Sequence, residues 1–312
     1  MVGCIAAVAA KQDVPSSSTY SLDKPNLTLD DVVVSSELKN CLRDWVACVK
    51  GEDHKTNLVG AKPPRGILLH GSPGNGKSTI ARALAGELGS RFFILESAQL
   101  QASFLGLGAK NVKEAFENAK RNAPSVIFID EIDILTDREK SGYRTHQDTQ
   151  ATLTTLLTEL DGVKDNHDVF VLAATNRPNA LDKALTRPGR LGLMFEILNP
   201  DQAGCCVILQ AELKKNGTLL AECVTDEALE AKAGDLAAAG LSGAEVADVA
   251  QRAKQCAQRS GASVVSLQDV VNAATAAIEA KATRTSLQGQ RKSRELGAPM
   301  LVLERTAATV LP

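Results

Sequence analysis

The chain has 312 residues, of which 44% are hydrophobic, so it can build one large or two modest domains with a real core. Its 35 basic and 37 acidic residues leave a formal charge of −2, which excludes a globally basic surface that would attract nucleic acid. The seven cysteines are an odd number without CxxC spacing, so we expect reduced thiols rather than a disulfide framework or a zinc site.

The N-terminal part begins with residues 1–26, which are rich in Ser, Pro and Lys and lack a regular period, so we expect a flexible lead. Residues 1–10 are apolar but lack the basic start of a signal peptide. No apolar run reaches the roughly 20 residues that a membrane span needs. We therefore expect a cytoplasmic protein without a membrane span.

Apolar strands and amphipathic helices alternate over the next part of the chain. Apolar residues recur every three or four positions between the strands, which indicates helices, and the strands themselves are apolar throughout. The expected fold class is α/β, with a parallel five-stranded sheet covered by helices on both faces. The predicted strands are residues 66–70, 92–96, 125–130, 169–175 and 193–198.

After residue 200 no strand pattern appears, and Ala, Leu, Glu and Lys dominate up to about Lys281. One helix should start at Ser242, because Glu245 completes a capping box, and another should start at Ser266. The last residues are basic and poorly patterned. We therefore expect a flexible lead (1–26), an α/β domain (27–198), a helical domain (199–281) and a basic flexible tail (282–312).

Residues 71–78, with the sequence GSPGNGKS, match the pattern of a phosphate-binding loop. Glycines let consecutive backbone N–H groups point at phosphate oxygens, and the following helix N-terminus favours the same anion. Lys77 can reach the β and γ phosphates, and the Ser78 hydroxyl can bind Mg²⁺. The residues expected to bind the nucleotide here are Ser72, Pro73, Gly74, Asn75, Gly76, Lys77, Ser78 and Thr79.

A second motif lies 53 positions after Lys77 (130 minus 77), where the apolar run 126–129 ends in Asp130 and Glu131. Ligands of parallel α/β sheets bind at the carboxyl ends of strands, so Asp130 is expected to hold Mg²⁺. Glu131 is free to orient and polarise the attacking water, as phosphoryl transfer requires. Together the two motifs predict a P-loop NTPase that binds a nucleotide with Mg²⁺.

With these motifs the chain resembles an AAA+ ATPase of the AAA clade from about Leu27 to Ile278, and it is most similar to the FtsH-type module. The resemblance implies that Asn176 senses the γ phosphate. It also implies that Arg187 and Arg190 act as arginine fingers in the neighbouring subunit's ATP site, which suits a planar cation that stabilises transition-state charge. Residues 191–193, Leu-Gly-Leu, depart from the Phe-Asp-Arg that usually follows these arginines.

Other segments match the family in part. The resemblance places Gly243 and Ala244 near the adenosine. It also implies that the Asp-Asp-Val run ending at residue 32 leads into the adenine pocket at Val33, a position where the family has a small residue. Residues 104–108, Phe-Leu-Gly-Leu-Gly, resemble the pore loop that grips unfolded polypeptide in FtsH-type proteases, but an ordinary apolar turn has the same composition. The expected grip residues are Phe104, Leu105 and Gly106.

The function that the resemblance implies is a homo-oligomeric ring, expected to be a hexamer, that threads, unfolds or remodels polypeptides with ATP. An adaptor or a separate protease is a further expected partner. No HExxH pattern occurs, so zinc proteolysis is not expected of these residues. Two alternatives stay open: a DNA-acting AAA+ motor or loader, which the balanced charge disfavours, and an adaptor that binds ATP without hydrolysing it, which Glu131 and the two arginines disfavour.

Overall fold

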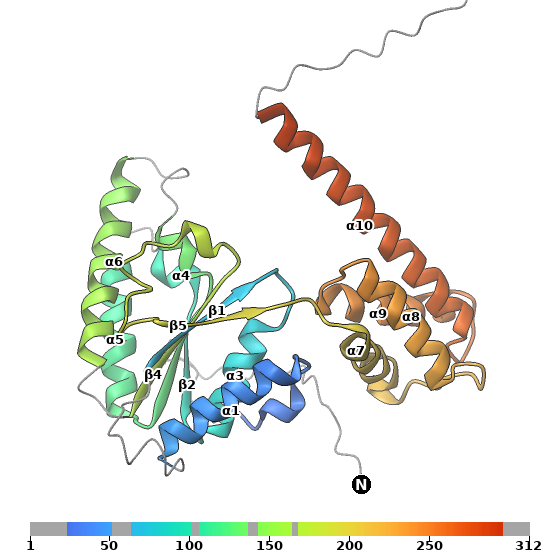
Figure 1. The fold of residues 1–312 in the computed structure, drawn as a ribbon, viewed down its shortest axis with the longest axis horizontal. Helices are drawn as coiled ribbons and strands as arrows, with labels where there is room; N and C mark the ends of the chain where they lie inside the picture. Colours follow the sequence, from blue (N-terminus) through green and yellow to red (C-terminus); the bar gives the residue numbers. More distant parts are fainter. Residues whose placement is uncertain (1–23, 52–63, 102–105, 137–142, 164–167, 296–312) are drawn as a thin grey trace, which may run out of the picture.

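The computed structural model describes residues 24–51, 64–101, 106–136, 143–163 and 168–295. In Figure 1 an α/β unit is followed by a separate group of helices. The α/β unit contains η1 (Leu29–Asp31), α1 (Ser36–Lys50), β1 (Gly66–Gly71), α3 (Lys77–Glu87), β2 (Arg91–Leu95), α4 (Ser97–Leu100), α5 (Leu107–Arg121), β3 (Ser125–Ile129), η2 (Ile132–Leu135), α6 (Tyr143–Gly162), β4 (Val169–Thr175), η4 (Pro178–Ala180) and β5 (Leu193–Ile197). The helical group contains α7 (Gln202–Lys214), η5 (Lys215–Gly217), α8 (Asp226–Ala238), α9 (Gly243–Arg259) and α10 (Leu267–Glu295).

The five strands form one parallel sheet in the order β2-β3-β4-β1-β5. Parallel neighbours need crossover connections, and helices supply them here. The chain leaves β1 for the far edge at β2, returns through β3 and β4, and later places β5 on the other side of β1. All carboxyl ends therefore meet at one edge of the sheet, where the turn after β1 lies between the ends of β4 and β5.

Helices bury both faces of the sheet. Successive side chains of a strand point to opposite faces, so Leu68 of β1 packs with α5 and α6, while Ile67 of the same strand packs with α1 and α3. The sheet lies between these two cores, which explains why its inner strands are apolar throughout. The predicted α/β fold with helices on both faces is confirmed.

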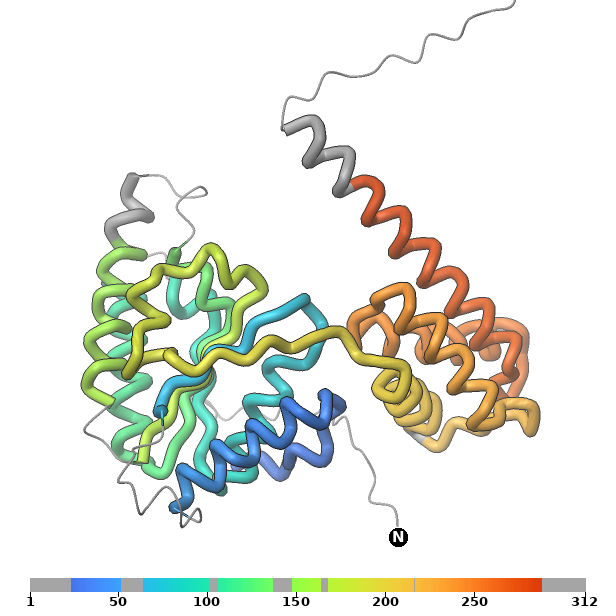
Figure 2. Tube along the Cα trace, viewed as in Figure 1, coloured from blue at the N-terminus to red at the C-terminus, as the bar shows by residue number. Residues whose placement is uncertain are grey.

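The helices after β5 have a hydrophobic core of their own, which we call the lid core. It joins α7, α8, α9 and the first part of α10 through residues such as Leu209, Leu236, Val249 and Val270, all of them fully buried. Figure 2 shows the chain passing from β5 into α7 over a short connection. The helical group is therefore a second unit, and below we call it the lid.

The last helix differs from its prediction. α10 continues to Glu295, so the expectation that residues 282–312 form a flexible tail is wrong for residues 282–295. These residues contain many good helix formers and no proline. Ion pairs from Lys281 and Arg284 to Glu245 also hold this part of α10 against α9. Residues 296–312 lie outside the described part of the chain.

Candidate nucleotide-binding site

The glycine-rich turn between β1 and α3 lies at the carboxyl edge of the sheet. Gly74 and Gly76 have φ angles of 81° and 75°, in the left-handed region that glycine adopts without steric cost. Gly76 is also the N-cap residue of α3, so the turn opens directly onto a helix N-terminus. The dipole and backbone N–H groups of such a terminus favour an anion, as in phosphate-binding loops.

Lys77, the first residue of α3, holds its ammonium group inside this turn. Its Nζ donates hydrogen bonds to the carbonyl oxygens of Gly71 and Ser72, both at 2.9 Å, and to Oδ1 of Asn176 at 2.6 Å. Burial lowers the pKa of Lys77, although the negative charge of Asp130 acts in the opposite sense. The lysine is thus positioned between the P-loop and the end of β4.

Asp130 follows β3 and meets the first turn of α3. Its Oδ2 accepts a hydrogen bond from the Ser78 hydroxyl at 3.1 Å, and its Oδ1 accepts one from the backbone N–H of Glu131 at 2.9 Å. Glu131 has a φ angle of 50°, a left-handed conformation that is uncommon for a residue other than glycine. Local strain of this kind clusters at functional sites, where the surrounding structure holds it in place.

A cleft of about 360 Å³ lies beside these groups. It contains a carboxylate that the sequence analysis missed, Glu96, which caps α4 directly after β2. The signal was available, because Glu96 is the first charged residue after its strand, as Asp130 is after β3. The lining residues are Ser78, Arg82, Ile94, Glu96, Ser97, Phe128, Asp130 and Glu131.

The end of β4 is tied to the same region. Asn176, predicted as the sensor, reaches Lys77 with its Oδ1, and the preceding Thr175 donates its hydroxyl to Oδ1 of Asp133 at 2.7 Å. Asp133 was not among the predicted site residues, although it belongs to the same acidic run as Asp130. It connects η2 to β4 and so helps to hold Asn176 at the site.

The lid contacts the P-loop through the first residues of α9. The backbone N–H of Ala244 donates to the Gly74 carbonyl at 2.9 Å, and that of Gly243 donates to Oδ1 of Asn75 at 3.3 Å. Val33, which precedes α1 in the chain, packs against the start of α7. A Cβ atom added to Gly204 of α7 would lie 3.2 Å from Cγ1 of Val33. The predicted lid residues therefore face the P-loop, and Val33 lies where the α/β unit meets the lid.

The two predicted arginine fingers differ in their surroundings. Arg187 is exposed. Arg190 makes a bidentate ion pair with Asp161 at the end of α6, in which Nε lies 3.1 Å from Oδ1 and Nη2 lies 2.7 Å from Oδ2. Its Nη1 donates a hydrogen bond to the Ala184 carbonyl at 2.7 Å. The hydrogen bonds that Arg190 donates to the Asp161 carboxylate raise the pKa of Arg190. Arg187 is therefore the more exposed of the two, since the Arg190 side chain is 17% exposed.

The predicted pore loop is described only at its end. Phe104 and Leu105 lie outside the described residues. Gly106 is the N-cap of α5 in a left-handed conformation, and its N–H donates to Oδ1 of Asp148 at 2.7 Å. α5 begins at Leu107.

Comparison with known proteins agrees with this geometry. Residues 67–198 match the profile of the family described as "ATPase family associated with various cellular activities (AAA)". The chain is 36% identical over 267 residues to "ATP-dependent zinc metalloprotease FtsH" of Staphylococcus haemolyticus, which covers 85% of this chain and 36% of that protein. It is 39% identical over 255 residues to the protein of the same name from Chloroflexus aggregans, covering 81% of this chain and 38% of that protein.

The chain spans less than half the length of these curated relatives. Within its described residues, no helix combines the length and the apolar character needed to cross a membrane. The sheet order, the P-loop and the similarity to FtsH all concern the same region. The chain therefore contains an ATPase domain of the AAA family and is related to FtsH over most of its own length.

Proposed function

We propose that the chain hydrolyses ATP with Mg²⁺ and, as a hexameric ring of identical subunits, uses the released energy to thread, unfold or remodel protein substrates. The observation that carries the ATPase part is the convergence of Lys77, Ser78, Asp130 and Glu131 at one edge of the sheet. The P-loop supplies a helix N-terminus for phosphate, and Lys77 supplies a cation that meets the β and γ phosphates.

The residues present fit a magnesium ion. The Ser78 hydroxyl and the Asp130 carboxylate lie within 3.1 Å of each other, and both are hard oxygen ligands of the kind that Mg²⁺ prefers. When bound, Mg²⁺ neutralises charge on the phosphate oxygens. Glu131 is exposed toward the same cleft, so its carboxylate is placed to orient a water and accept a proton from it.

The ring and the protein substrate rest on the relatives and on the arginines. The relatives are named as ATP-dependent metalloproteases, so coupling of ATP to work on polypeptides is the shared part that we propose for this chain. Arg187 is exposed and available to a neighbouring subunit's γ phosphate, which supports a shared site. Phe104, Leu105 and Gly106 are proposed to grip the polypeptide, and an adaptor or separate protease is a proposed partner.

The experiment that tests the ATPase proposal uses Glu131→Gln, which replaces the carboxylate by an uncharged amide group of nearly the same size. We expect ATP affinity to stay within about twofold of wild type and turnover to fall by roughly 100-fold or more, because general-base catalysis contributes about 10² to 10⁴ in rate. Equilibrium binding of a fluorescent ATP analogue and phosphate release measure the two quantities. Loss of binding in step with turnover, or unchanged turnover, would contradict the assigned role.

A further inference from the structure

The side chain of Asn75 connects the P-loop to two other segments. Its Nδ2 donates hydrogen bonds to the Ile197 carbonyl at 3.3 Å and to Oδ1 of Asn199 at 2.8 Å. Its Oδ1 accepts the N–H of Gly243 at 3.3 Å. One buried amide thus joins the phosphate turn, the connection between β5 and α7, and the first turn of α9.

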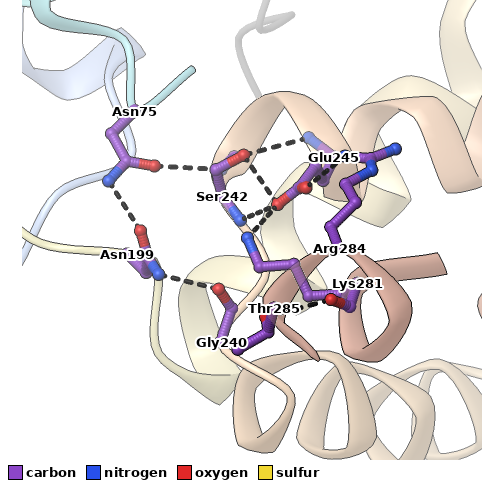
Figure 3. Close-up of polar contacts among 9 residues, drawn as sticks. Asn75, Asn199, Gly240, Ser242, Glu245, Lys281, Arg284 and Thr285 are labelled. Carbon is purple, nitrogen blue, oxygen red and sulfur yellow. Dashed lines mark hydrogen bonds and ion pairs between the residues drawn. The ribbon is translucent and has the colours of Figure 1, made fainter. Parts of the chain in front are cut away.

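Asn199 extends this connection into the lid. Its Nδ2 donates to the Gly240 carbonyl at 2.7 Å, in the turn that precedes α9. Figure 3 shows the path from Asn75 through Asn199 to Gly240 on one side, and from Asn75 to the start of α9 on the other. Asn75 and Asn199 therefore hold both ends of the short segment 240–243, and we call this pair the lid latch.

The first turn of α9 is itself held firmly. The Ser242 N–H donates to Oε2 of Glu245 at 2.9 Å, and the Ser242 hydroxyl contacts the same oxygen at 3.1 Å. Glu245 also receives Lys281 at 2.8 Å and Arg284 at 3.2 Å, both from α10. Ser242, which belongs to this second cluster, lies in the chain between Gly240 and Gly243, the two residues that the latch contacts (Figure 3). We therefore expect a movement of segment 240–243 to move α9 and α10 together.

The latch uses only groups that a phosphate does not need. The latch occupies the Asn75 side chain, and the neighbouring Ala244 contact occupies the Gly74 carbonyl, so neither uses a backbone N–H group of the turn, the kind of group that binds a phosphate. It also gives acceptors to Gly243 and Ala244, whose N–H groups have no partner within their own helix. The lid can therefore stay closed over the phosphate turn whether or not a nucleotide is bound.

We propose that the lid latch, Asn75 with Asn199, holds the lid closed over the phosphate turn and so sets how fast nucleotide enters and leaves. Asn75 and Asn199 are positioning residues, because they act through the lid and not on the reacting atoms. This inference rests on the proposed nucleotide site. Since the latch stabilises closure to the same extent with and without nucleotide, it slows association and dissociation by the same factor and leaves the equilibrium constant nearly unchanged.

The latch can be tested without nucleotide by amide hydrogen exchange of the whole chain. The variant is Asn199→Ala, which removes an exposed side chain outside the P-loop and should leave folding intact. We expect exchange of the Ala244 N–H to accelerate by roughly three- to tenfold, the factor of one or two lost hydrogen bonds. Its acceptor, the Gly74 carbonyl, is untouched by the substitution, so faster exchange reports opening of the lid.

Two controls separate opening from general loosening. The Glu245 N–H is held by the Ser242 hydroxyl within the same turn, so its exchange should not change in Asn199→Ala. Gln210→Ala removes a comparable exposed amide hydrogen bond, from Gln210 to Asp226 inside the lid, and should leave Ala244 exchange at the wild-type rate. Equal acceleration at Ala244 and Glu245 would overturn the latch in favour of fraying of α9.

Stopped-flow binding of a fluorescent ATP analogue tests whether the latch controls the rates of nucleotide entry and release. In Asn199→Ala we expect the association and dissociation rate constants to rise together by roughly three- to tenfold, with Kd changed by less than about twofold. In the background of Asn75→Ala, Asn199→Ala should add less than it does alone, because the shared bond is already gone and only the bond to the Gly240 carbonyl is still to be lost.

Each outcome decides one proposal. Unchanged rate constants, or a change in Kd through dissociation alone, would overturn the latch as a gate. Wild-type protein that binds no nucleotide would overturn the proposed function, while the exchange of Ala244 would still decide whether the latch exists.

Discussion

Lys77 is buried, and burial disfavours the charged form of its ammonium group. The surrounding carbonyl oxygens of Gly71 and Ser72 and the amide oxygen of Asn176 compensate for part of the lost hydration, yet the pKa is still lowered from its ordinary value. A structural role alone is better served by an apolar side chain of similar size, because a buried cation costs free energy. The buried lysine thus supports the proposed phosphate ligand, which would bring further negative charge to the ammonium group.

We therefore expect Lys77→Ala to weaken ATP binding by roughly 10-fold or more, because hydrogen bonds to charged groups contribute about 1.5 to 3 kcal/mol each. The thermal stability of the ligand-free protein should change little, because loss of the hydrogen bonds is offset by removal of a poorly solvated charge. Isothermal titration and a melting curve measure the two effects. As a control, Lys232→Ala removes an exposed ion pair with Asp235 in the lid and should leave binding unchanged. Full ATP affinity in Lys77→Ala would contradict the P-loop assignment.

At the scale of elements, Glu245 joins the start of α9 to α10. Burial alone raises the pKa of its carboxyl, but the hydrogen bonds from Lys281 and Ser242 outweigh it, and the pKa is lowered from its ordinary value of 4.5. A carboxyl whose pKa is lower in the folded state contributes stability above its unfolded pKa, and this contribution is lost as pH falls through the folded value. The contact should therefore weaken only in acid, below about pH 4.5.

We expect Glu245→Gln to lower the free energy of unfolding near pH 7 by about 1 to 2 kcal/mol, since a partly exposed charge network is screened by solvent. The difference from wild type should shrink as the pH falls below about 4.5. Urea unfolding at several pH values measures it, and an Asp248→Asn variant serves as a control, because its pair with Arg252 is exposed and lies within α9 alone. A difference independent of pH would contradict the role that we assign to the charge of Glu245.

At the scale of the whole molecule, the two arginines after η4 have unequal freedom. Arg190 is bound to Asp161 and to the Ala184 carbonyl of the same chain, so its removal also disturbs the junction of α6 with the segment before β5. Arg187 is exposed, and its replacement should not alter folding. Arg187 is therefore the cleaner test of a catalytic site shared between subunits.

We expect Arg187→Ala subunits alone to lose ATP hydrolysis by roughly 10³-fold, the usual contribution of an arginine supplied in trans. Lys77→Ala subunits should be inactive for a different reason, because they fail to bind ATP. When the two are mixed, intact P-loops meet intact arginines at some interfaces, and phosphate release should exceed the sum of the separate samples. Mixtures that never exceed that sum, despite demonstrated co-assembly by size analysis, would contradict a shared site.

The sequence determined the α/β alternation, the P-loop and the acidic strand end, because each depends on local patterns: apolar periodicity, glycine and lysine spacing, and charge at the end of a buried strand. The start of α9 at Ser242 and Glu245 was predicted for the same reason, and the capping box is confirmed. Backbone geometry within a few residues decides such features, so a single sequence contains them.

Only the tertiary structure decided which distant residues meet. Asn75 and Asn199 are 124 positions apart, Arg190 and Asp161 are 29 apart, and the pairing of Glu245 with Lys281 and Arg284 crosses 36 and 39 positions. A polar side chain on an exposed connection has no periodicity to mark its partner, and α10 was predicted too short because its supporting contacts come from another helix. Such contacts depend on how the lid packs on the sheet, and packing between segments is set by the whole fold rather than by any local pattern.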